Sequence, residues 1–104
     1  MARQTSYAYQ QEVLRKFSGT LSQLEQELRT FSNKYEAAIY ALYEEDGLME
    51  EVYADYQALH MNKFMSSIET LANLILSEDI PFVEKEQRFI LSRSLQDHLG
   101  TEKE

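Results

Sequence analysis

The sequence contains no cysteine and no tryptophan among its 104 residues. Without cysteine it cannot form a disulfide, a thiolate metal site or a cysteine nucleophile. Three glycines and one proline leave few positions for tight turns, which argues against a many-stranded β fold. Basic residues are also scarce, with 10 Lys and Arg against 18 Asp and Glu and a formal net charge of -8. Because an acidic chain repels phosphate, we expect no nucleic-acid binding.

Long hydrophobic runs are missing as well. No run approaches the roughly 18 apolar residues of a membrane-spanning helix, and residues 1–6 lack the apolar core of a signal peptide. We therefore expect no membrane insertion and a cytoplasmic chain. Hydrophobic residues make up 43% and charged residues 27%, which is typical of a folded domain and predicts a single helical domain over residues 1–104.

Apolar residues recur at every seventh position in the first half of the chain. One series consists of Leu14, Leu21, Leu28, Tyr35 and Leu42, and a second, offset by three, of Phe17, Leu24, Phe31 and Ala38. Two such series form the a/d seam of packed helices, so the spacing predicts a first helix over about residues 6–45, capped by Thr5 or Ser6. Gly19 is a poor helix former, but the register continues past it and predicts an unbroken helix.

Turn residues divide the remainder of the chain. Gly47 suits the left-handed position that ends a helix, and Asp46 can cap the next helix, predicted over about residues 48–77. Pro81 disfavours helix at the preceding residue, which predicts a break and a third helix over about residues 81–98. The predicted fold class is all-α: a long antiparallel helical hairpin with a shorter third C-terminal helix.

The predicted second helix carries more apolar side chains than one neighbouring helix covers. They spread over an arc of roughly 260°, and the short third helix covers only part of it. We therefore expect another helical protein, or a second copy of this chain, to pack against it; a three-helix bundle that buries nearly everything is the alternative. The residues predicted to bind this partner are Met49, Val52, Tyr53, Tyr56, Met61, Phe64, Met65 and Ile68.

Residue patterns that carry catalysis are absent from the sequence. Six acidic residues lie between Glu44 and Asp55, but they lack the ligand spacing of a calcium-binding EF-hand loop. No glycine-rich phosphate loop, nucleophile elbow or His-Glu-x-x-His zinc motif occurs. We expect no enzymatic activity, no metal and no cofactor.

An acidic chain of about one hundred residues, arranged as two long helices around the turn at Asp46-Gly47, resembles the Trp-x-Gly family of small type VII secretion proteins. It resembles the helical partners of LXG toxins more closely still. The resemblance covers residues 6–90, with Asp46-Gly47-Leu48 in place of the Trp-x-Gly turn. It implies a protein that pairs with another helical protein without catalysis. The family's export signal is an aromatic residue followed four places later by an acid, which Phe82 and Glu86 match.

The leading hypothesis is a non-enzymatic helical partner, or chaperone, that binds the N-terminal helical targeting domain of a type VII-secreted toxin and supports its export. Two alternatives remain open. An acidic mimic of nucleic acid that inhibits a DNA-binding defence enzyme would use the net charge of -8 as its active feature. A self-assembling coiled-coil module would show helicity that depends on concentration.

Overall fold

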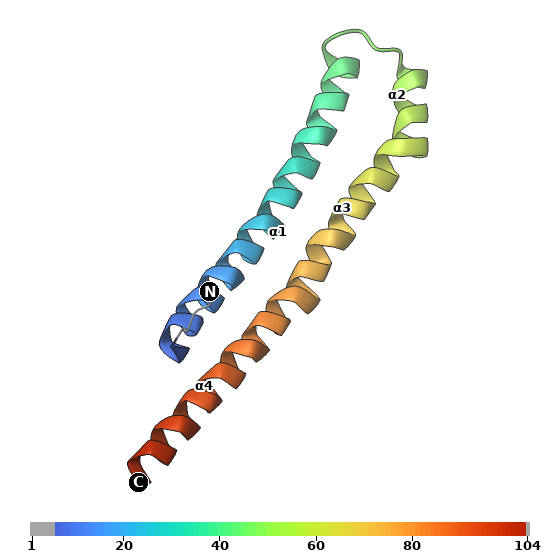
Figure 1. Cartoon of the computed structure of the whole chain (residues 1–104). Coiled ribbons are helices and arrows are strands. Elements are labelled where there is room, and N and C mark those ends of the chain that lie inside the picture. Colours follow the sequence, from blue (N-terminus) through green and yellow to red (C-terminus); the bar gives the residue numbers. More distant parts are fainter. Residues whose placement is uncertain (1–5, 104) are drawn as a thin grey trace, which may run out of the picture.

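The computed structural model describes the backbone of residues 6–103 and the side chains of residues 6–95, so residues 1–5 and 104 of the predicted domain lie outside it. Apart from Ser6 and the turn at 45–49, all described residues are helical, which confirms the all-α class. The chain folds into a rod measuring 79 × 20 × 20 Å. Two helical arms run side by side in opposite directions and are joined at one end by the turn (Figure 1).

The first arm is one long helix, α1 (Tyr7–Glu44), within one residue of the predicted bounds. Ser6 caps it, because its Oγ accepts a hydrogen bond from the backbone N–H of Tyr9 at 3.1 Å. The helix is continuous through Gly19, as the unbroken register predicts. A Cβ built on Gly19 would meet nothing within 4 Å, so packing does not require a glycine there.

The turn depends on Gly47, which adopts a φ of +84°. Glycine occupies this left-handed region without the steric penalty of a side chain. Beside it, the N–H of Leu48 donates to the carbonyl oxygen of Leu42 at 2.9 Å and so satisfies one of the last carbonyls of α1. The expectation that Asp46 caps the next helix is wrong, because that helix starts at Glu50 and its N-cap is Met49, which makes no side-chain cap.

The second arm, residues 50–103, is a continuous helical rod with two wider turns. It consists of α2 (Glu50–Tyr56), the π turn η1 (Gln57–Met61), α3 (Asn62–Leu74), the π turn η2 (Ile75–Asp79) and α4 (Ile80–Lys103). The predicted break near Pro81 and the separate third helix over 81–98 are therefore wrong. A proline ring inside a helix clashes with the carbonyl four residues earlier. Pro81 directly follows the first residue of α4, where the wider turn η2 accommodates it.

The two π turns keep one side of the second arm against α1. The buried and half-buried positions that face α1 repeat every three or four residues along this arm, except for two intervals of five, one across η1 and one across η2; the half-buried Gln57 and Glu86 each lie beside a seam position. Each π turn thus absorbs one extra residue, which would otherwise rotate all later side chains away from α1. The positions in this seam are Tyr53, Tyr56, Met61, Met65, Ile68, Ala72, Ile75, Ile80, Val83, Gln87 and Ile90.

The seam of α1 uses only one of the two predicted heptad series. Leu14, Leu21, Leu28 and Tyr35 are half-buried, but they alternate with a largely polar series that includes the small side chains Ser18 and Ser32. Small side chains allow the axes of two helices to approach closely. The placement of the second predicted series in the seam is wrong. Its three large members are 44–51% exposed: Phe17, Leu24 and Phe31.

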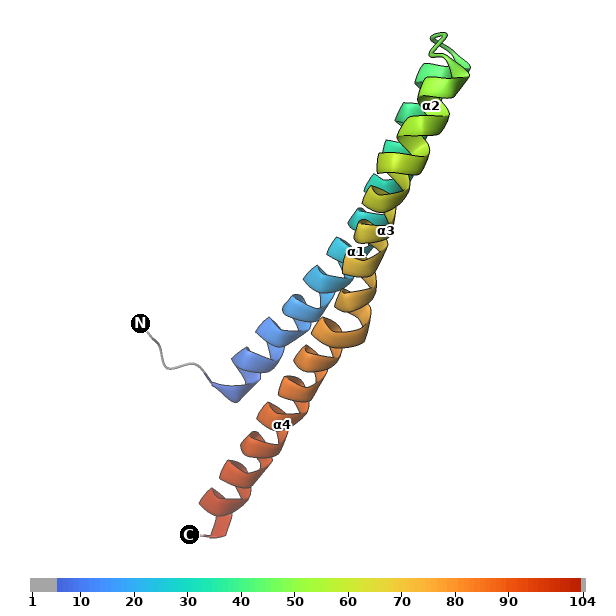
Figure 2. The ribbon, with the colours of Figure 1, turned by 90° about the vertical axis from the view of Figure 1, so that its right-hand side faces the viewer.

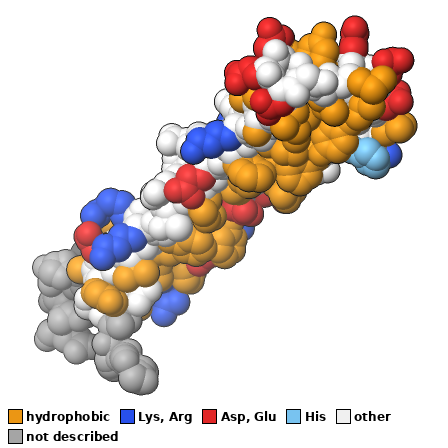
Figure 3. Space-filling model, turned by 90° about the horizontal axis from the view of Figure 1, so that it is seen from above, with side chains coloured by type: hydrophobic (Ala, Val, Ile, Leu, Met, Phe, Trp, Pro, Cys, Tyr) orange, Lys and Arg blue, Asp and Glu red, His pale blue; other side chains and the backbone are white. Residues whose placement is uncertain are grey.

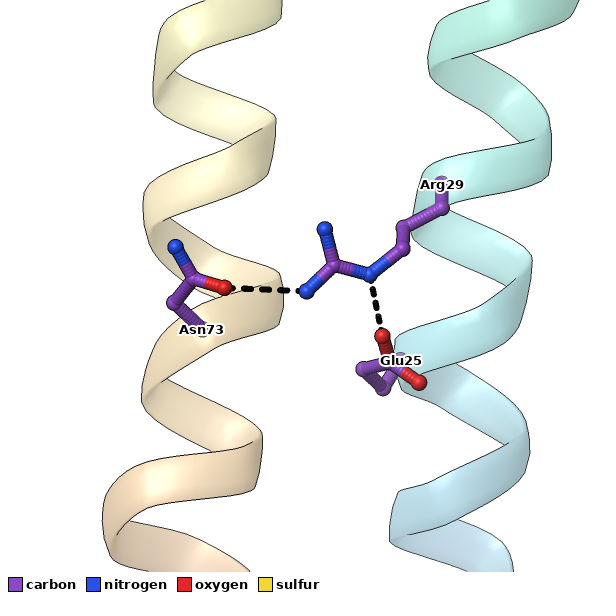
Figure 4. Close-up of polar contacts among 3 residues, drawn as sticks. All are labelled: Glu25, Arg29 and Asn73. Carbon is purple, nitrogen blue, oxygen red and sulfur yellow. Dashed lines mark hydrogen bonds and ion pairs between the residues drawn. The ribbon is translucent and has the colours of Figure 1, made fainter.

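A polar contact joins the two arms near the middle of the rod (Figure 4). Glu25 is a seam residue of α1, only 8% exposed, and its carboxylate pairs with the Nε of Arg29. The Nη2 of Arg29 then donates to the Oδ1 of Asn73 on α3 at 2.9 Å. A buried charge that has one well-placed partner favours a single register between helices. In the perpendicular view the arms superpose near the turn and diverge toward their free ends (Figure 2).

Candidate functional site

An exposed band of large hydrophobic side chains runs along one side of the rod (Figure 3), and its members come from both arms. On each arm its members lie beside the seam. The rings of Phe31 and Phe64, whose centroids are 6.1 Å apart, show that the two arms present these residues on the same side. Leu24 lies seven residues, or two helical turns, from Phe31, and Leu71 lies the same distance from Phe64. These two leucines therefore lie level with each other further along the rod. We call this set the apolar face: Phe17, Leu24, Phe31, Phe64, Leu71, Leu74, Phe82 and Phe89, each 40–56% exposed.

The opposite side of the rod is polar in its middle part, between Ser22 and Asn33 on α1 and between Asn62 and Asn73 on the second arm. The hydrogen bond from Arg29 to Asn73 crosses the seam on this side, which places both residues away from the apolar face. The residues that follow seam positions in sequence lie on the same side, because each residue rotates by about 100° around a helix. We call this set the polar face: Ser22, Gln26, Arg29, Asn33, Asn62, Ser66, Glu69 and Asn73.

A shallow groove opens on the apolar face where α1 passes η1. Its walls include Phe31, Leu59 and His60, and its floor is closed by a pair of tyrosines. The hydroxyls of Tyr35 and Tyr56 lie 2.6 Å apart and share a hydrogen bond. This bond, together with desolvation and the charge that Tyr56 would carry, raises the pKa of Tyr35 to about 12. The hydroxyl of Tyr35 is therefore protonated at neutral pH.

Tyrosines also pack together at the turn end of the rod. The rings of Tyr43 and Tyr53 stack with centroids 5.1 Å apart, and Tyr40 packs edge-on against Tyr53 at 5.9 Å. The hydroxyl of Tyr40 donates to a carboxylate oxygen of Glu44 at 2.9 Å, which raises the pKa of Tyr40. Aromatic pairs of this geometry stabilise contacts by about 0.5–1.5 kcal/mol each. The cluster therefore closes the end of the hairpin.

The structure divides the eight residues predicted to bind a partner into three groups. Met61 and Ile68 are buried against α1, at 0% and 6% exposure, so the expectation that they face a partner is wrong for this hairpin. Both lie in the seam because the π turn η1 sets the register there. Tyr53, Tyr56 and Met65 are half-buried. The exposed members are Met49, Val52 and Phe64, of which Phe64 belongs to the apolar face.

Most of the apolar face was absent from that predicted set. Leu71 and Leu74 lie on the second arm beyond the chosen residues, and α1 contributes a series that was assigned to the seam. The signal was present in the sequence as the repeat of Phe17, Leu24 and Phe31. Only the packing of the arms shows that this repeat faces outward.

The two residues that match the predicted export signal lie inside the continuous helical rod of the second arm. Phe82 is 56% exposed and Glu86 is half-buried, four residues apart on α4. Residues four apart lie on one side of a helix, one turn from each other. The phenyl ring is therefore open to solvent and continuous with the apolar face.

Charged side chains are distributed unevenly along the rod. Residues 36–60, at the turn end, include seven exposed acids and no Lys or Arg. Within the described residues, no group of three or more acidic or histidine side chains is arranged to hold a metal ion. None of the helices in the described part is both long enough and apolar enough to cross a membrane. Comparison of the chain with protein-family models, curated proteins and solved structures finds no match.

Proposed function

We propose that the chain is a non-enzymatic helical partner protein that buries its apolar face against the helices of another protein. The observation that carries this proposal is the apolar face itself, which presents eight large side chains to solvent at 40–56% exposure. Burying one such side chain fully is worth about 1.5–3 kcal/mol relative to leaving it exposed. A contiguous band of this kind is typical of a protein–protein interface.

The total surface of the molecule supports the same proposal. The accessible surface is 7811 Å², whereas a compact monomer of 12.2 kDa exposes about 6,100 Å². The excess, about 1,700 Å², is larger than the roughly 800 Å² that each partner contributes to a standard interface. Only four hydrophobic residues of the described side chains are buried, so the hairpin has a small core of its own. A partner would supply the burial that a single seam lacks.

We further propose that the partner is the N-terminal helical targeting domain of a type VII-secreted toxin. Two long antiparallel helices joined at a glycine turn suit this role, because a second helical pair can lie along them to form a four-helix bundle. The acids concentrate at the turn end, whereas a mimic of nucleic acid needs carboxylates spaced along one surface.

Co-expression tests this proposal directly. The chain is produced together with the helical N-terminal domain of the large protein encoded in the neighbouring reading frame, and the complex is isolated by size-exclusion chromatography with light scattering. We expect a stoichiometric complex. Substituting Phe31→Glu and Leu71→Glu together should weaken it at least about 100-fold, since two charges would enter a desolvated interface.

A matched control uses the polar face. Gln26 and Asn62 are both exposed, and the pair Gln26→Glu and Asn62→Glu adds the same charge on the opposite side of the rod. The complex should survive this change with an unaltered dissociation constant. Equal weakening by both pairs, or no complex with the parent chain, would refute the proposal.

A further inference from the structure

We infer that, when no other protein covers it, the apolar face binds a second copy of this chain in antiparallel orientation, giving a four-helix bundle in which the two-fold axis passes near Leu24 and Leu71. This inference concerns the free protein and does not depend on which protein the chain binds. Its support comes from the layout of the apolar face and from the charges at the two ends of the rod.

The central part of the apolar face is arranged symmetrically about Leu24 and Leu71, whereas Phe82 and Phe89 lie beyond it toward the open end. Leu24 and Leu71 lie level with each other, and Phe31 and Phe64 lie two helical turns toward the turn end. Two turns in the other direction, Phe17 lies on α1, beside the stretch of the second arm between Leu74 and Phe82. A two-fold axis at the leucines would place the phenylalanine pair of one copy over the Phe17 region of the other. Each copy then supplies the same patch, as an isologous interface requires.

The charges of the two ends select the antiparallel orientation. Residues 36–60 at the turn end carry seven acids and no Lys or Arg, all seven acids exposed. At the open end, residues 7–20 and 75–95 carry five exposed Lys and Arg against five acids and so have no net charge. In an antiparallel pair, each strongly acidic end lies beside an end without net charge. In a parallel pair, two ends that each carry a charge of about -7 would lie together and repel across less than a Debye length.

The available area is sufficient for such a dimer. The rod is 79 Å long and 20 Å wide, so one broad face exceeds the roughly 800 Å² per partner of a standard interface. The described side chains on the opposite face are largely polar in the middle of the rod, so pairing through the apolar face leaves that region hydrophilic. Because a two-fold interface uses the same patch of both copies, we expect a closed dimer rather than an open-ended assembly.

Sedimentation equilibrium of the purified chain tests whether the dimer forms. We expect a dimer at micromolar concentration. The pair Leu24→Glu and Leu71→Glu should raise the dissociation constant of this dimer at least about 100-fold. The pair Gln26→Glu and Asn62→Glu on the polar face should leave the dimer intact. A parent chain that stays monomeric throughout, or equal dissociation by both pairs, would overturn the inference.

A distance measurement on chains that keep the parent apolar face tests the orientation and does not depend on variants that disrupt the interface. The chain has no cysteine, so spin labels attach only at introduced ones. A label at Glu51→Cys lies about twenty residues, or about 30 Å along the helix, from the two-fold axis in each copy. The two labels of an antiparallel dimer should therefore lie about 60 Å apart. In a dimer mixed from Glu51→Cys and Ser92→Cys chains, the two labels should lie within about 30 Å, the width of a four-helix bundle.

The opposite pattern of distances would overturn the inference. Short distances between the two Glu51→Cys labels, together with long distances in the mixed dimer, would mean a parallel arrangement. This result, or a monomeric parent chain, would leave the binding of a different helical protein still to be tested by co-expression. Conversely, an antiparallel dimer that does not bind the neighbouring protein would support this inference and refute the proposed function.

Discussion

The apolar and polar faces of the hairpin are built from the same helices and the same heptads, yet they have opposite character. On one side of the seam the flanking positions hold phenylalanine and leucine; on the other they hold serine, asparagine, glutamine and an arginine that bonds across the seam. A hairpin that functioned alone would need only one apolar seam and two hydrophilic sides. The difference indicates that one side is built for solvent and the other for contact with more protein.

The largest expected effect distinguishes the seam from the apolar face. Met61 is fully buried and Leu71 is 53% exposed. Truncation of Met61→Ala should lower the free energy of unfolding by about 2–5 kcal/mol, because it leaves a cavity in a small core. Leu71→Ala should lower it by less than about 1 kcal/mol in the monomer. Urea denaturation at the lowest practical protein concentration measures both, and a comparable loss for the two variants would mean that the apolar face belongs to the core of the hairpin itself.

Two of the three glycines provide the next test, since Gly19 lies on the polar side of α1 and Gly47 forms the turn. Gly19→Ala should raise the free energy of unfolding by about 1 kcal/mol, because the position is helical and a Cβ meets nothing within 4 Å. Gly47→Ala should lower it by about 1 kcal/mol, since the φ of +84° disfavours any side chain. Thermal unfolding followed by circular dichroism measures both shifts. Gly19→Ala should leave self-association unchanged, and altered association would place this part of α1 in an interface.

An effect of similar size is expected for the contact that crosses the polar face. Replacing Arg29→Met removes the hydrogen bond to Asn73 and the partner of the buried Glu25, and should lower the free energy of unfolding by about 1 kcal/mol. Arg15→Met is the matched control, because Arg15 pairs only with exposed Glu12 on its own helix. Urea denaturation compares the two variants. Equal effects would show that the contact between the arms adds nothing to stability.

The smallest effect concerns the tyrosine pair below the groove of the apolar face. The folded state raises the pKa of Tyr35 to about 12 from an ordinary value of 10.0. The folded protein therefore holds this proton more tightly than the unfolded chain, so the stabilisation is complete below pH 10 and is lost as the pH rises through 12. The difference in stability between the parent chain and Tyr35→Phe should shrink over this interval. Denaturation at a series of alkaline pH values measures it, and a constant difference would contradict the hydrogen bond to Tyr56.

Local sequence signals predicted the helices better than they predicted the surface. The serine cap, the seven-residue repeat and Gly47 placed the ends of α1 and the turn within a residue or two of those observed. The helix break predicted at Pro81 is wrong. Proline usually breaks a helix, but Pro81 follows a π turn that accommodates its ring. No periodicity rule reveals a π turn, since it shows in the sequence only as one interval of five in a pattern of threes and fours.

The candidate site was harder to predict for a related reason. The series Leu14, Leu21 and Leu28 forms a possible seam with either of two neighbouring series, three residues before or three after it. Hydrophobicity favours the series of Phe17, which would make the helix bury its bulkiest side chains. The structure instead packs the series of Ser18 against the second arm and leaves the phenylalanines outside. Burial of Met61 and Ile68 follows from the same choice of register.

The sequence by itself determined that the chain is helical, where its long first helix begins and ends, and that it carries more apolar surface than one seam can bury. Each of these depends on neighbours within a few residues: a cap, a glycine conformation or a helical repeat. Only the tertiary structure decided which side of each helix is buried, because that choice minimises the packing energy of two helices at once. The apolar face is the side that this choice left exposed, and it is therefore a property of the packed pair of arms rather than of either helix alone.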